Sequence, residues 1–133
     1  MKKVFAIILF AGVVAAIVFY TLYNKPHRNP ADETSIQISA EELFDNFNKD
    51  ETNANTQYLD KVLEVKGKVL EVTTNQDQTT VIVLETSDPL FGIRCTMNSK
   101  VAIDTDDLVI IKGICTGYLS DVVLTNALLV KKI

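Results

Sequence analysis

Residues 109–118 read Val-Ile-Ile-Lys-Gly-Ile-Cys-Thr-Gly-Tyr, and they contain the clearest structural pattern in the sequence. Every second residue from Val109 to Cys115 is apolar or glycine, whereas Lys112 falls on the opposite face, a spacing typical of a half-buried β-strand. Gly113 stands on the inward row and contributes no side chain to a core. It therefore marks a bend or a close approach of another backbone.

The same pattern occurs earlier, where residues 65–69 read Val-Lys-Gly-Lys-Val and Gly67 stands on the inward row. Beyond Val69 the apolar residues change phase to Leu70 and Val72, which is the effect of a β-bulge. Two long strands that each bend at an inward glycine predict a sheet that rolls into a small barrel.

Outward from these two strands, the chain holds three further β-rich segments and one helical segment. Ser39-Ala40-Glu41-Glu42 has the form of a capping box, so a short helix is expected from there to Lys49, with a further turn up to Tyr58. The expected strands are 61–73, 79–86, 91–97, 109–118 and 122–132. This order predicts a mainly β domain over residues 39–133, a five-stranded Greek-key barrel of the OB-fold type with a short N-terminal accessory helix.

The N-terminal segment has a different character. After a basic start over residues 1–3, residues 4–23 run without a charge and make a helix about 30 Å long, enough for a single transmembrane helix. A cleaved secretory signal is the alternative. The extra basic charge before the span favours a signal anchor in the cytoplasmic membrane, with the soluble domain extracytoplasmic. Residues 24–38 are expected to form a flexible tether, in which His27 is a solvated residue.

Charge is distributed unevenly between the two parts of the chain. Of the 13 basic residues, four lie in the first 28 positions and nine follow, whereas all 17 acidic residues come after position 31. The remainder of the chain therefore carries a net charge of about −8, which keeps a domain soluble and repels phosphate backbones.

Several short motifs carry a resemblance to a known family. They are Ser39-Ala40-Glu41-Glu42-Leu43, Tyr58 with residues 61–69, Ile93-Arg94-Cys95 and residues 112–117. Together they resemble the tRNA-anti-like family of bacterial OB-fold domains. The resemblance implies an OB-fold that commonly follows a membrane or lipid anchor, and by analogy it raises nucleic-acid binding as an alternative function.

Cys95 and Cys115 are the most distinctive chemical pair. Each is in phase with apolar neighbours, so both are expected to face the barrel interior from strands that are not adjacent. In an oxidising envelope a disulfide between them would add about 3 kcal/mol to stability. The alternative is two buried free thiols that pack as small hydrophobic groups. With no histidine in the domain, neither cysteine is expected to act as a nucleophile.

The ligand-binding candidates are few. Phe91, Arg94, Lys100 and Tyr118 are the residues from which a stacking or basic surface is expected, whereas nucleic-acid binding normally needs more aromatic and basic groups. The acidic loop 104–107 lacks the pattern of a calcium loop, and no metal, cofactor or catalytic residue is predicted. The sequence thus predicts a non-catalytic, membrane-tethered binding module of the bacterial cell envelope, whose ligand is a protein, a glycan or a small molecule. The alternatives are a nucleic-acid binder and a disulfide-stabilised or redox-sensitive structural module.

Overall fold

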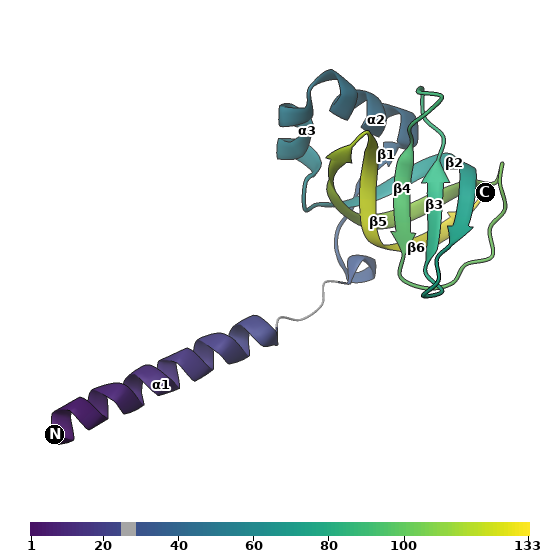
Figure 1. The fold of residues 1–133 in the computed structure, drawn as a ribbon. Helices are drawn as coiled ribbons and strands as arrows, with labels where there is room; N and C mark the ends of the chain where they lie inside the picture. Colours follow the sequence, from purple (N-terminus) through teal and green to yellow (C-terminus); the bar gives the residue numbers. More distant parts are fainter. Residues whose placement is uncertain (25–28) are drawn as a thin grey trace.

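The computed structural model of the chain describes residues 1–24 and 29–133 (Figure 1). Its elements in chain order are α1 (Lys2–Tyr23), η1 (Pro30–Asp32), β1 (Ile36–Ser39), α2 (Ala40–Lys49), α3 (Glu51–Tyr58), β2 (Val62–Thr74), β3 (Thr80–Leu84), β4 (Ile93–Met97), β5 (Leu108–Leu119) and β6 (Asp121–Lys132). Figure 1 shows the strands wrapped into a barrel, with α2 and α3 together at one end of it.

Five strands close the barrel in the order β2-β3-β4-β6-β5, because β5 pairs back onto β2. The first half of β2 pairs with β5 and its second half pairs with β3, and β4 runs parallel to β6. The register of β2 against β3 shifts between Val69 and Glu71. This shift confirms the predicted bulge, and it bends β2 where the strand passes from one neighbour to the other. The predicted OB-fold is confirmed.

The core follows the alternation seen in the sequence. Val109, Ile111, Gly113 and Cys115 are all buried, whereas the residues between them are only partly covered. β3 is the exception, since all five of its residues are buried. Burial of each large aliphatic side chain stabilises the fold by about 1.5–3 kcal/mol. The barrel interior is therefore filled by a cluster of buried hydrophobic side chains.

The two inward glycines lie where other parts of the chain come close. A Cβ atom added at Gly67 would be 2.9 Å from the Cβ of Ala40 and 3.2 Å from the Cβ of Leu84. One added at Gly113 would be 3.1 Å from the Cβ of Ala127 on β6. Gly67 thus permits the first turn of α2 to pack against the barrel, and Gly113 permits close packing of β5 and β6.

The α2 helix begins as its capping sequence predicts. The Ser39 hydroxyl oxygen accepts a hydrogen bond from the Glu42 backbone N–H at 3.2 Å. The apolar face of α2 is buried on the barrel end, with Phe44 and Phe47 at most 2% exposed. Truncation of such a phenylalanine typically costs about 3–5 kcal/mol. The helix is therefore an integral part of the core.

The N-terminal part of the domain differs from the predicted tether. Residues 36–39 form strand β1, which pairs in parallel with β2 and places Ile38 opposite Val65. Pro30 is buried, and the Lys112 ammonium donates to the Ala31 carbonyl oxygen at 3.5 Å. The prediction of a flexible segment up to residue 38 is therefore wrong for β1 and η1. Positions 25–28 of the tether, which include His27, lie outside the described residues.

Helix α1 spans 22 residues, and none of its side chains is buried. By length and composition it is the one described helix able to cross a membrane, and an N-terminal signal sequence would pass the same test. The chain therefore carries a long apolar N-terminal helix in front of an OB-fold barrel.

Candidate functional site

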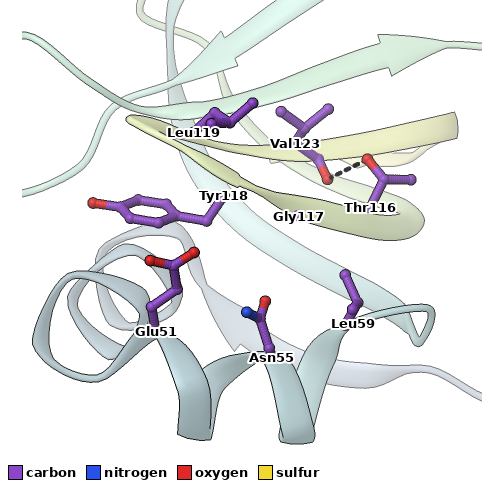
Figure 2. Close-up of a pocket in the computed structure, with 8 residues that line it drawn as sticks. All are labelled: Glu51, Asn55, Leu59, Thr116, Gly117, Tyr118, Leu119 and Val123. Atoms are coloured by element: carbon purple, nitrogen blue, oxygen red, sulfur yellow. Dashed lines mark hydrogen bonds between the residues drawn. The ribbon is translucent and has the colours of Figure 1, made fainter.

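A groove of about 400 Å³ lies at the end of the barrel, between helix α3 and the hairpin that joins β5 to β6 (Figure 2). Its volume is within the range of small-ligand and side-chain binding sites. It is lined by Glu51, Asn55, Leu59, Thr116, Gly117, Tyr118, Leu119 and Val123. One helix face and one hairpin thus form its two walls.

The α3 wall follows from helical spacing. Glu51, Asn55 and Leu59 are four residues apart in turn, which places them in a row along one side of the helix and its C-cap. The Asp50 carboxylate caps α3 by accepting from the Asn53 N–H at 3.1 Å. At the other end, the Tyr58 ring is buried, and its hydroxyl oxygen accepts from the Asn46 amide at 2.9 Å. These contacts cap α3 and join its C-terminal end to α2.

The hairpin wall depends on an irregularity in β5. The register of β5 against β6 shifts between Cys115 and Gly117, and Gly117 has a φ of 147°, which side chains of L-residues rarely allow. A Cβ atom at Gly117 would have no neighbour within 4 Å, so the groove is open above this backbone. The Thr116 hydroxyl donates to the Val123 carbonyl oxygen at 3.3 Å and braces the two strands (Figure 2). Leu119 at the tip is 89% exposed.

Tyr118 connects the groove to the core. Its ring stacks on Phe47 with 5.5 Å between centroids and meets the edge of Phe44 at 6.2 Å. Phe47 also contacts the Tyr58 ring at 5.9 Å. These four aromatic rings seal the end of the barrel, so the part of Tyr118 that lines the groove belongs to a rigid cluster.

The side chains that line the groove are of the kinds that bind a ligand. Figure 2 shows the Glu51 carboxylate pointing from α3 toward the hairpin, below the Tyr118 ring. Glu51 forms no ion pair with any of the residues that the structure describes. Leu59, Leu119 and Val123 also line the groove and provide apolar surface. The groove therefore combines an aromatic ring, apolar side chains and a carboxylate that has no ion pair within the described part of the chain.

The four residues predicted as a ligand surface do not come together. Arg94 lies on β4, and its Nε donates to the Asp121 carboxylate at 3.3 Å. Asp121 also accepts from the backbone N–H of Gly92, which places the loop after Phe91 beside the hairpin. Lys100 follows the opposite end of β4. Tyr118 on β5 packs its ring on Phe47 at the end of the barrel, whereas the Arg94 side chain is on the exposed face of β4.

The outer face of β3 and β4, where many OB-folds bind nucleic acid, offers little for that purpose. Val83 on β3 is opposite Arg94 on β4, and Val81 is opposite Thr96. Within the described strands this face has no aromatic side chain, and its arginine is already paired with Asp121. Base stacking and phosphate binding both lack their usual groups here.

The predicted disulfide between Cys95 and Cys115 is wrong: both are free, buried thiols. Leu124 on β6 is opposite Cys95 on one side and opposite Cys115 on the other, so a whole strand separates them. Two strand spacings of about 4.8 Å put their Cα atoms about 9–10 Å apart, beyond the reach of a disulfide. Burial raises the pKa of Cys95 to about 12 and that of Cys115 to about 11.

The acidic loop before β5 is engaged in structural contacts. The Asp107 carboxylate accepts from the Asp104 N–H at 2.9 Å and pairs with the Lys132 ammonium at 3.0 Å, which holds its pKa below the usual value. Asp106 pairs with Lys68 at 3.4 Å. Among the residues described, no group of three or more potential metal ligands comes together.

Sequence reasoning missed most of the groove. Only Tyr118 among its lining residues was a predicted ligand contact. Glu51, Asn55 and Leu59 carry a signal in their spacing of four, and Leu119 is an apolar residue at the tip of a turn. Neither signal identifies a binding site from the sequence alone, because the site forms only where α3 packs against the hairpin.

Comparison with known proteins agrees with the architecture. No curated protein matches the chain. One family model matches residues 1–129, which is nearly the whole sequence, including the apolar helix and the barrel. The chain belongs to the tRNA_anti-like family.

Proposed function

We propose that this protein is a non-catalytic binding module of the bacterial cell envelope, tethered to the cytoplasmic membrane by α1, with its barrel on the extracytoplasmic side. The observation that carries the proposal is the preformed groove between α3 and the β5–β6 hairpin. Sites of this volume with apolar walls and a few polar groups are typical of ligand recognition.

The proposed membrane attachment has separate support. Residues of α1 are apolar over a length that matches a hydrocarbon core, and none of its side chains is buried against the rest of the described chain. Lys2 and Lys3 precede the helix, which favours a cytoplasmic N-terminus. The acidic character of the rest of the chain favours a soluble domain beside the membrane.

The experiment blocks the groove without disturbing the core. Asn55 is only partly exposed and lines the groove, whereas Thr52 lies on the same helix, is exposed and does not line it. The full chain in lipid nanodiscs is incubated with solubilised envelope material, and retained molecules are identified by mass spectrometry. We expect a ligand that wild type and Thr52→Trp retain and that Asn55→Trp loses. Equal retention by all three proteins would place binding elsewhere.

A further inference from the structure

The residues that line the groove are of two chemical kinds. Leu59, Leu119 and Val123 are apolar, and Leu119 is almost fully exposed at the hairpin tip. Glu51 is acidic and Tyr118 is aromatic, and Figure 2 shows the Glu51 carboxylate below the Tyr118 ring. An occupant that contacts both kinds of residue needs an apolar group and a cationic group.

The Glu51 carboxylate has no counter-ion among the residues at 1–24 and 29–133. Other acidic side chains at this end of the barrel have partners: Asp50 caps α3, and Asp121 binds Arg94 and the Gly92 amide. Glu51 has no cation beside it among the described residues. A carboxylate next to an aromatic ring is a suitable site for a guanidinium or ammonium group, which the carboxylate binds by charge and the ring by its π face.

The charge of the whole domain acts in the same direction. With nine basic and 17 acidic residues after position 28, the domain attracts cationic partners and repels anionic ones. An anionic glycan or a nucleic acid would bring negative charge to Glu51. A protein segment that carries a basic residue beside a large aliphatic residue fits both the groove and the surrounding field.

We propose that the groove binds a basic and apolar peptide segment of a partner protein. The aliphatic side chain contacts the apolar residues of the groove, and the cation lies against Glu51 and the Tyr118 ring. This inference depends on the proposed function, and it narrows the ligand to a protein segment of defined charge.

The test uses three blocked pentapeptides with Leu-Arg-Leu, Leu-Glu-Leu and Ser-Arg-Ser centres. Each is titrated into the full chain in zwitterionic nanodiscs, and backbone amide shifts are followed by NMR. We expect Leu-Arg-Leu to shift the amides of Gly117 and Leu119. It should bind about two- to tenfold more tightly than Leu-Glu-Leu, the range expected for reversal of one exposed charge pair. Ser-Arg-Ser should bind more weakly than Leu-Arg-Leu, because its serine side chains cannot pack on the apolar residues Leu59, Leu119 and Val123.

Charge-reversed variants distinguish the effect of the Glu51 carboxylate on peptide binding from the effect of the net charge of the domain. Glu51→Lys should reverse the preference between Leu-Arg-Leu and Leu-Glu-Leu. Glu71→Lys makes the same change in net charge at an exposed position of β2 that does not line the groove, and it should preserve the preference. The inference is overturned if no peptide shifts the groove amides, if the acidic peptide binds as well as the basic one, or if both variants behave alike. Binding of Leu-Glu-Leu in the groove would contradict this inference but agree with the proposed function. Retention of the envelope ligand by Asn55→Trp would contradict the proposed function itself.

Discussion

Gly67→Ala tests the packing of α2 on the barrel. The added Cβ atom would be 2.9 Å from the Cβ of Ala40 and 3.2 Å from the Cβ of Leu84, whereas carbon atoms normally approach to about 3.5–4.0 Å. Relief of such overlap in a packed core costs about 1–3 kcal/mol. The smaller conformational entropy of the unfolded chain offsets about 0.4–1 kcal/mol of this cost. We expect a net loss of about 1–2 kcal/mol.

The assay is urea unfolding of the full chain in mild detergent, followed by circular dichroism. In thermal unfolding of the same sample, the expected loss for a domain of about 100 residues corresponds to a fall in Tm of about 4–16 °C. Ala40→Gly is the matched variant, because it removes the atom closest to the new methyl group. The double variant should be more stable than the sum of the two single changes predicts, by about 0.5 kcal/mol or more.

Two results would contradict the close contact between Gly67 and Ala40. The first is a Gly67→Ala protein as stable as wild type or more stable, which would mean that α2 and the barrel are not in close contact at this point. The second is additivity of the two substitutions within about 0.3 kcal/mol, which would mean that Ala40 is not the neighbour that resists the new side chain.

Three further predictions concern the thiols, the acidic loop and the N-terminal helix. Because burial raises their pKa values to about 12 and 11, Cys95 and Cys115 should resist alkylation at about pH 8 in the native protein and react fully after denaturation; rapid native labelling, or a mass change on reduction, would contradict the structure. A backbone N–H and the Lys132 ammonium hold the pKa of Asp107 below its ordinary 3.8, so its contribution to stability is present above that pH and lost as pH falls through the folded value. The stability gap between wild type and Asp107→Asn in urea should therefore close below about pH 4, and a gap independent of pH would be the opposite result. The full chain should remain in the membrane pellet after alkaline carbonate extraction. Val13→Asp raises the free energy of membrane insertion by about 2.5–3.5 kcal/mol, so it should release a part of the protein. A mature protein that lacks the first residues by mass spectrometry would instead indicate a cleaved signal.

Most of the barrel could be predicted because its signals are local. The alternation from Val109 to Cys115 and the phase change after Val69 depend only on the side-chain period of a strand. The Ser39 cap likewise depends on residues three apart. Each of these features appears in the structure where the sequence places it.

Strand β1 was missed because its signal is short. Ile36 and Ile38 alternate over only three residues, and the strand is defined by its parallel pairing with β2, far along the chain. The disulfide prediction failed for a related reason. Strand phase shows that Cys95 and Cys115 both face inward, but it does not show that Leu124 lies between them.

The groove could not be predicted because it depends on tertiary geometry. The register shift after Cys115 returns Tyr118 to the inner side, where its ring packs on Phe47. Uninterrupted alternation would have placed Tyr118 on the outer face, near Arg94. The position of Glu51 opposite this ring follows only from the packing of α3 against the hairpin.

The most direct test of the groove as the binding site is photo-crosslinking in intact bacterial cells from a reactive amino acid at position 119, in place of Leu119. The same amino acid at Val130, which is also exposed but distant from the groove, is the control. We predict an adduct of defined mass from position 119 in the membrane fraction, absent from position 130 and reduced by Asn55→Trp. Identical adducts from the two positions, or an adduct unaffected by Asn55→Trp, would contradict the groove as the binding site.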